Sequence, residues 1–325
     1  MIHARIRPKS GEILHDPSPE QLHKLLEDTA NLSWIDLESP TPDELGLIAG
    51  ILGWDHLTVE DLTNQGQRAK LEQFPTYHYL VMHALEYGAP PEGGQPRLTT
   101  PEIDFVIGPS YVVSVHYVHL AHLTENREVV ERLEQLMSKG PDYILYVLTD
   151  RLVDSYFPVL DEMQDAVDDL EDSIIENVRG ELLPRIFDMK HDAMVLRKVT
   201  SPLLDVFSRL TAPGMGIVSE EHAFYFRDVH DHIIRVFEST DSYRELMSGA
   251  LDAYLSTTNN RMNDVMKRLT VVAALFLPIT FLTGLLGMNL RESPPWDDYF
   301  FWVFLGGMFG LSVAQYLYMR RKGWT

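Results

Sequence analysis

The sequence predicts an α+β membrane protein, in which a mixed α/β domain is followed by a long helical stalk and two C-terminal transmembrane helices. Two stretches, 269–290 and 299–319, contain no charged residue, and each is long enough to cross a bilayer as a helix, which takes about 20 residues. Short β-rich runs occur only within 1–125, and helical periodicity dominates afterwards. The chain therefore divides into 1–125, a helical region over 126–216, a stalk over 217–268, and the membrane part.

Acidic residues outnumber basic ones, with 48 Asp and Glu against 27 Lys and Arg and a formal net charge of −21. Such a chain repels phosphate backbones, which argues against nucleic acid as a partner, and it attracts cations. No Cys is present, so disulfides and zinc-thiolate sites are excluded and any metal must be bound by oxygen ligands or His. The first residues do not resemble a secretory signal, so we expect the N-terminal part to stay in the cytosol.

The first domain, 1–125, combines short strands with short helices. Its β-rich runs are 81–85, 103–107 and 111–115. Gly108-Pro109-Ser110 predicts a hairpin turn between the last two runs, and the Gly/Pro-rich stretch 88–96 predicts a loop. Helical patterns at 18–26 and 58–62 interleave with the strands, which predicts helices layered on a small sheet.

The helical region, 126–216, contains an amphipathic pattern. One apolar face has alternating spacings of three and four: Leu160, Met163, Val167, Leu170 and Ile174. The opposite face carries acids at similar spacings: Asp161, Asp165, Asp168, Asp172 and Glu176. Such an acidic stripe is either a solvated helix face or a surface that concentrates cations, and the pattern alone leaves both interpretations open.

A long helix is predicted to link this region to the membrane. The stretch 212–216 interrupts the preceding helix, and Ser219 followed by Glu220 and Glu221 offers an N-cap with favourable charge in the first turn. We expect one helix from about residue 220 to about Gly287, which at 1.5 Å per residue is roughly 100 Å long.

Basic residues flank the two membrane spans on one side. Lys267 and Arg268 precede the first span, and the basic tail 320–325 follows the second. By the positive-inside rule, both termini are expected in the cytosol, with the protein in the cytoplasmic (inner) membrane. The connection 291–298 is a short outer loop, and its acids are candidates for gathering cations at the outer mouth: Glu292, Asp297 and Asp298.

The first span has two chemically different faces. Along it and its cytosolic extension, the residues at alternating spacings of three and four are mostly small or polar: Asn263, Met266, Thr270, Ala273, Leu277, Thr280, Gly284 and Gly287. This stripe either packs closely against another helix or lines a water-filled pore. Pro278 favours the pore, because it frees the carbonyl of Ala274, and such a group in a membrane needs a protein partner or water.

A pore lined by one helix per chain requires an oligomer around a symmetry axis. If helices are cylinders about 10 Å across, a ring of four leaves a hole of roughly 4 Å and a ring of five leaves roughly 7 Å. The larger hole suits a largely hydrated ion. Mg²⁺ gives up its water reluctantly, so neutral amides and carbonyls that hold its hydration shell are suitable selectivity elements.

The first span ends in Gly287-Met288-Asn289. A triplet of this kind, closing the first of two C-terminal spans behind a long stalk, resembles the CorA family of magnesium transport proteins. The similarity extends over 263–290, over stalk segments 225–232 and 246–252, and over N-terminal segments 57–61 and 67–72, so it covers essentially the whole chain. The outer loop departs from the family's Met-Pro-Glu-Leu string, which leaves open which acid captures ions.

The resemblance implies a funnel-shaped homopentamer that transports divalent metal ions, most of all Mg²⁺ and also Co²⁺ or Ni²⁺. Gly287, Met288 and Asn289 would form its outer ion ring, the stripe would line its pore, and Met266 and Leu277 would be apolar constrictions.

The resemblance also implies gating by intracellular Mg²⁺ bound between cytosolic domains. Asp228 and Asp165 would then lie at subunit interfaces as regulatory metal ligands, and Asp252 would face the inner funnel. Bound cations would offset repulsion between carboxylates and favour a closed ring.

Two other functions stay open on the sequence. A Zn²⁺ transporter of the same superfamily is the nearer one, although His residues are scattered and His230 and His232 do not share a helix face. A membrane-anchored sensor or enzyme belongs to a different class and predicts a nucleotide loop, a nucleophile elbow or paired catalytic acids. The sequence has no such motif, so we expect a transporter and not an enzyme.

Overall fold

The computed structural model describes residues 1–9, 12–89, 93–120, 137–176, 182–212, 215–287 and 298–323. They belong to two units: Met1–Ser173 with Arg179–Ala250, and Ile174–Val178 with Leu251–Thr325. The first unit contains the β-sheet and most of the helical region. The second holds the C-terminal part of the stalk and both candidate membrane helices.

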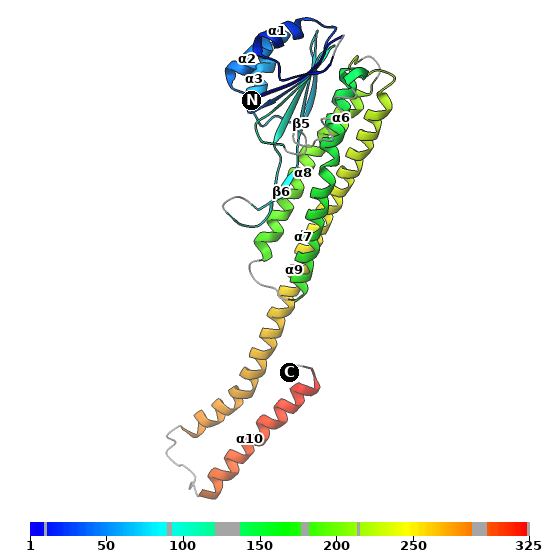
Figure 1. The fold of residues 1–325 in the computed structure, drawn as a ribbon. Coiled ribbons are helices and arrows are strands. Elements are labelled where there is room, and N and C mark those ends of the chain that lie inside the picture. The colour runs from blue at the N-terminus through cyan, green and yellow to red at the C-terminus, as the bar shows by residue number, and fades with distance from the viewer. Residues whose placement is uncertain are drawn as a thin grey trace. The chain divides into compact units, whose positions relative to one another are not determined.

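The first unit is built on a seven-stranded mixed sheet (Figure 1). In spatial order its strands are β2 (Leu14–His15), β1 (Ile2–Arg7), β3 (Leu32–Glu38), β9 (Tyr111–His116), β8 (Glu102–Ile107), β5 (His78–His83) and β4 (Lys70–Gln73). The pairing of β3 with β9 is parallel, and the other neighbouring pairs are antiparallel. A separate two-stranded sheet is formed by β6 (Glu86–Gly88) and β7 (Arg97–Thr99).

The predicted β-rich runs lie in the centre of this sheet. The runs 103–107 and 111–115 are confirmed as strands, and 81–85 is partly strand because β5 ends at His83. The predicted turn joins β8 to β9, with the Gly108 N–H donating to the Tyr111 carbonyl at 2.9 Å. A Cβ at Gly108 would collide with the Tyr111 ring, so glycine is required at this turn.

Three short helices cover one face of the sheet: α1 (Pro19–Glu27), α2 (Pro42–Leu52) and α3 (His56–Thr63). A capping box starts α1, in which the Ser18 hydroxyl accepts from the Gln21 N–H and the Gln21 amide oxygen accepts from the Ser18 N–H. Caps of this kind stabilise a helix by about 1 kcal/mol. The apolar residues of these helices share one core with alternate strand residues such as Ile35 and Val113.

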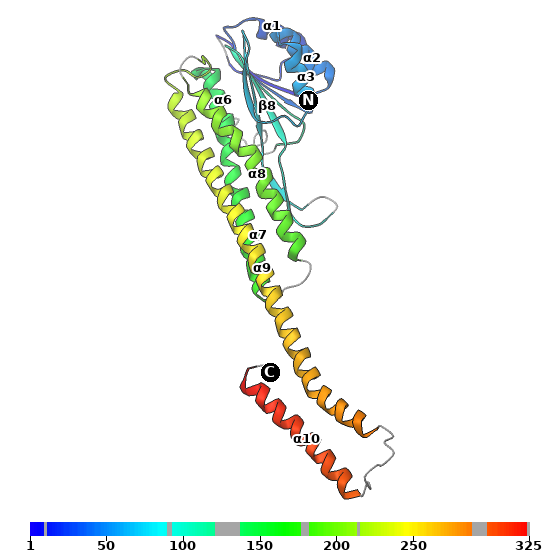
Figure 2. The same cartoon turned by 180° about the vertical axis from the view of Figure 1, so that it is seen from behind.

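Helices make up the rest of the first unit: η1 (Met137–Lys139), α6 (Pro141–Asp154), α7 (Tyr156–Glu176), α8 (Leu182–Leu210) and the first part of α9 (Ala223–Leu286). Figure 2 shows α7, α8 and α9 running side by side. The predicted apolar face of α7, from Leu160 to Ile174, is buried, and Asp161, Asp165, Asp168 and Asp172 are exposed. The amphipathic pattern is therefore confirmed.

The long helix α9 has 64 residues, or about 95 Å at 1.5 Å per residue. Its predicted N-cap at Ser219 is wrong, because the helix begins at Ala223. The Ser219 N–H and hydroxyl donate instead to Asp142 Oδ2 at 3.0 and 2.8 Å, and His222 Nδ1 lies 2.9 Å from the same oxygen. Asp142 is only 6% exposed, and a buried carboxylate needs such donors more than a helix end needs a cap.

We expect Asp142→Ala to lower the free energy of unfolding by about 2 kcal/mol, because it leaves the buried His222 imidazole without its acceptor. Ser219→Ala is the matched control and should cost less than about 1 kcal/mol, since it removes only one donor at an exposed position. Chemical denaturation of the full-length protein in detergent measures both. Equal losses in the two variants would contradict the role of Asp142.

Candidate ion pathway and metal centres

The second unit contains the candidate ion pathway. Among the described residues, two helices are long and apolar enough to cross a membrane: α9 in its C-terminal part and α10 (Asp298–Arg321). The predicted stripe lies on α9 and on the residue that follows it, and all of its members are exposed: Asn263, Met266, Thr270, Ala273, Leu277, Thr280, Gly284 and Gly287.

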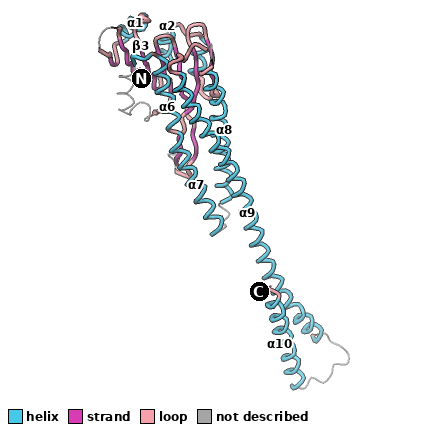
Figure 3. The backbone as a smooth tube through the Cα atoms, turned by 90° about the vertical axis from the view of Figure 1, so that its right-hand side faces the viewer, coloured by secondary structure: helices cyan, strands magenta, loops and turns pink. Residues whose placement is uncertain are grey.

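The least exposed residues of the same part of α9 lie on a different face. Val271 is buried, and the half-buried residues are Ala274, Leu275, Pro278, Ile279 and Leu282. On α10 the least exposed residues also share one face: Phe304, Met308, Ser312, Gln315 and Met319. Figure 3 traces α10 beside the C-terminal part of α9. The chain itself therefore leaves the stripe uncovered.

Hydroxyl groups on this part of α9 are satisfied within the helix. The hydroxyls of Thr270, Thr280 and Thr283 donate to the carbonyls four residues earlier, at 2.7, 2.9 and 2.9 Å. Because the donor is used internally, the oxygen lone pairs of the stripe threonines remain for water or for the hydration shell of an ion.

The predicted outer ion ring is described only at its first residue. Gly287 follows the end of α9, and its N–H donates to the Thr283 carbonyl at 3.0 Å. Met288, Asn289, Glu292 and Asp297 lie outside the described residues, and Asp298 is the first residue of α10. The ring and the outer-mouth acids therefore stay predictions.

The three predicted regulatory acids are exposed. Asp165 lies on α7 and Asp228 on α9 in the first unit, whereas Asp252 lies on α9 in the second unit. Within the described residues, one group of three side chains could hold a metal ion, and none of these three acids belongs to it.

That group lies between α6 and α9. Asp150 and Asp154 are one turn apart on α6, His232 is on α9, and one ligand atom from each residue lies within 4.8 Å of the others. His232 Nδ1 is 3.2 Å from Asp154 Oδ1, and all three residues are half-buried. Two carboxylates and one imidazole are a suitable partial ligand set for a divalent cation.

Sequence reasoning missed this group. The i, i+4 spacing of Asp150 and Asp154 indicates a shared helix face, but the pairing with His232 depends on packing between two helices far apart in the chain. Asp228 lies one turn before His232 on α9, so this predicted regulatory acid is on the same side of the helix as the missed imidazole.

The sequence model of the family described as CorA-like Mg²⁺ transporter protein matches residues 29–321. The chain belongs to the CorA family. The cobalt/magnesium transport protein CorA of Thermotoga maritima is 30% identical over 307 residues, which cover 91% of this chain and 84% of the relative. YfjQ of Bacillus subtilis is 31% identical over 293 residues, which cover 90% of this chain and 89% of the relative.

The fold agrees with this membership. The complete structure of the CorA magnesium transporter from Methanocaldococcus jannaschii matches 100% of this chain and 99% of its own, with a TM-score of 0.79 and 21% sequence identity. The predicted family and the predicted α+β membrane fold are therefore confirmed. As a CorA family member, the chain is a membrane protein of a divalent cation transporter family, which sets aside the membrane-anchored enzyme or sensor.

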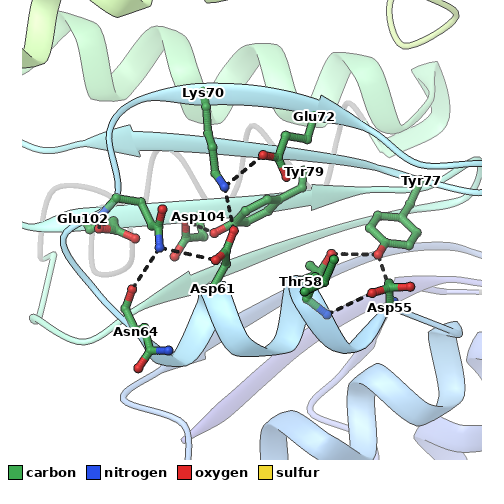
Figure 4. Close-up of polar contacts among 12 residues, drawn as sticks. Asp55, Thr58, Asp61, Asn64, Lys70, Glu72, Tyr77, Tyr79, Glu102 and Asp104 are labelled. Carbon is green, nitrogen blue, oxygen red and sulfur yellow. Dashed lines mark hydrogen bonds and ion pairs between the residues drawn. The ribbon is translucent and has the colours of Figure 1, made fainter.

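This CorA family member also buries ionisable groups in its sheet (Figure 4). Asp104 is 2% exposed and accepts a hydrogen bond from the Tyr79 hydroxyl at 2.9 Å. Glu102, two residues earlier on β8, is 5% exposed, and its Oε2 accepts from the Gly66 and Gln67 N–H groups at 2.6 and 2.7 Å. Glu102 thereby holds the loop between α3 and β4 against the sheet.

Near Asp104 and Glu102, one lysine forms ion pairs with two further carboxylates. Lys70 Nζ is 2.6 Å from Asp61 Oδ2 and 3.0 Å from Glu72 Oε1. Burial raises the pKa of Asp104 well above its ordinary value, and the neighbouring Glu102 raises it further. Burial also raises the pKa of Glu102, against the opposing effect of its two backbone donors. Asp104 and Glu102, with raised pKa values, therefore retain their protons more strongly than exposed carboxyl groups do.

We expect Asp104→Asn to weaken the pH dependence of stability. The folded-state pKa of Asp104 is raised, so the stability linked to its proton is present at acid pH and is lost as the pH rises through that pKa. Between about pH 5 and about pH 8 the free energy of unfolding should fall less in the variant than in the unmodified protein.

Chemical denaturation at several pH values measures this difference, with Glu72→Gln as the control from the same cluster. A pH dependence in Asp104→Asn as steep as in the unmodified protein would show that Asp104 does not hold its proton in the fold.

Proposed function

We propose that this chain is one subunit of a homopentameric channel that carries Mg²⁺, and also Co²⁺ or Ni²⁺, into the cytosol. The observation that supports this most directly is the stripe on α9, which is exposed while another face of the same helix is covered within the chain. Five copies around an axis would bring five stripes to a hole of roughly 7 Å, which admits a largely hydrated ion.

Residues along the stripe have distinct proposed roles. Thr270 and Thr280 offer neutral oxygens, and Met266 and Leu277 narrow the path with apolar side chains that resist wetting. At the outer end, Gly287, Met288 and Asn289 form a ring of carbonyl and amide groups that holds the hydration shell of the ion. Glu292, Asp297 and Asp298 raise the cation concentration at the mouth.

The proposed orientation places both termini in the cytosol of a cell, with the protein in its cytoplasmic membrane. Lys267 and Arg268 lie at the start of the first span, and Arg320 and Arg321 end α10. Basic residues at these two ends favour the cytosolic side. Ions would then enter at the outer ring and leave along the stalk, where Asn263 ends the stripe.

We further propose that intracellular divalent cations close the channel by binding at Asp150, Asp154 and His232, with Asp228 one turn away. A bound ion offsets the repulsion between these carboxylates and favours one packed arrangement of α6 and α9. Asp165, at an interface with a neighbouring subunit, and Asp252, facing the inner funnel, would add to this response to bound cations. Removal of the ions restores the repulsion and favours opening.

We expect Ala273→Phe to abolish ion flux, because a large ring on the stripe would fill the hole. Val272→Phe is the matched control, since Val272 is adjacent in sequence, also exposed, and outside the stripe. Flux of Mg²⁺, Co²⁺, Ni²⁺ and Zn²⁺ into liposomes measures both variants and the ion preference of the unmodified protein. Block by Val272→Phe alone would remove the stripe from the pathway, and a preference for Zn²⁺ would favour the zinc alternative.

We expect His232→Ala to raise by about tenfold the cytosolic Co²⁺ concentration needed to inhibit flux, because it removes the one nitrogen ligand of the three, and Co²⁺ binds imidazole nitrogen more readily than Mg²⁺ does. His230→Ala, two residues away on the same helix and also half-buried, should leave inhibition unchanged. Liposome flux at varied Co²⁺ on the cytosolic side measures the shift. Inhibition that is identical in the two variants would exclude the α6–α9 group as the regulatory site.

A further inference from the structure

His83 and Glu102 lie opposite one another in the cytosolic sheet. They are direct partners in the antiparallel pairing of β5 with β8, where side chains on one face have their Cβ atoms about 5 Å apart. Both are more than nine-tenths buried, at 8% and 5% exposed. Both also line one cavity, together with the loop 65–68, Thr100 and the α8 residue Lys198. Neither belongs to the pathway or to the α6–α9 group.

Each of the two side chains holds one polar atom that no described residue satisfies. Glu102 Oε2 accepts from Gly66 and Gln67, whereas its Oε1 is buried without a hydrogen-bond partner. His83 bonds to the Gln67 backbone, and its Nδ1 is likewise buried without a partner. The Gln67 N–H already serves Glu102, so His83 must use Nε2–H to reach the Gln67 carbonyl. In a neutral ring, Nδ1 is then an acceptor.

The environment keeps this imidazole neutral. Burial lowers the pKa of His83, and the nearby Lys198 ammonium lowers it further, against the opposing effect of the Gln67 carbonyl. The unsatisfied His83 Nδ1 and Glu102 Oε1 therefore belong to two residues that line one cavity. A cation satisfies both at once. Burial raises the pKa of Glu102, so a cation that binds both atoms must displace the proton that Glu102 retains.

We propose that His83 and Glu102 bind a divalent transition-metal ion, of the class of Co²⁺, Ni²⁺ or Zn²⁺. Imidazole nitrogen suits these ions, whereas Mg²⁺ takes oxygen ligands and keeps most of its water. The supporting contacts match those of metal sites, since the second nitrogen of His83 donates to a backbone carbonyl and the second oxygen of Glu102 is fixed by two N–H groups. Water in the cavity completes the coordination.

Lys198 adds to this selectivity. Lys198 is one of the residues that line the cavity, and its positive charge lowers the pKa of His83. The same charge would repel any cation, so only ions that gain strongly from a nitrogen ligand would be held. The site would therefore respond to transition metals at Mg²⁺ concentrations that occupy the carboxylate sites. Its ligands also hold the loop 65–68 through Gln67, so metal binding would stiffen the connection between α3 and β4.

The test uses the full-length protein in detergent, carrying His232→Ala so that the α6–α9 group contributes no imidazole. Co²⁺ alone is the probe, and its visible absorption reports nitrogen ligation while equilibrium dialysis reports affinity. We expect His83→Gln and Glu102→Gln each to weaken Co²⁺ binding at this site at least about tenfold. His78→Gln, on the same strand but on the other face, should leave it unchanged.

The unfolding temperature of each variant shows whether a loss of Co²⁺ binding is due to a loss of the fold. Gln at position 83 can still donate to the Gln67 carbonyl, so His83→Gln should unfold at the same temperature as its parent without metal and lose only the Co²⁺-dependent increase. Equal Co²⁺ affinity in the parent, His83→Gln and Glu102→Gln proteins would overturn the proposal. So would displacement of Co²⁺ by an equal concentration of Mg²⁺, or an absorption spectrum without a nitrogen ligand.

Discussion

Backbone hydrogen bonding in the bilayer is the constraint on which the C-terminal part of this protein depends. Hydrocarbon offers no partners to N–H and C=O groups, so a spanning segment must satisfy them internally as a helix. The chain meets this requirement with α9, which continues through Pro278 to Leu286. The same helix begins in the first unit, and it is one continuous helix from Asp228 to the stripe.

Local patterns were enough to predict what lies within one element. The faces of α7, the end of α9 near Gly287 and the strands at 103–107 and 111–115 follow from periodicity, because each depends on neighbours three, four or two residues away. The stripe on α9 was visible for the same reason. Its exposure could not be predicted, because it depends on where α10 packs.

Features that join distant segments were not predictable. The parallel pairing of β3 with β9, the group formed by Asp154 and His232, and the cavity shared by His83 and Lys198 all require the tertiary fold. The prediction of an N-cap at Ser219 was wrong for an energetic reason. A capping preference of about 1 kcal/mol is smaller than the cost of leaving the buried Asp142 carboxylate without donors.

The single parallel pairing in the sheet bears on how the protein is made. β3 pairs with β1 along one edge and with β9 along the other. During synthesis, the edge of β3 that pairs with β9 stays unpaired until residues 111–116 have been made. These residues are synthesised well before the first predicted membrane span, which starts at residue 269. The seven-stranded sheet can therefore form before the candidate membrane helices are inserted, and its unpaired edge is most prone to aggregation in the interval before β9 has been synthesised.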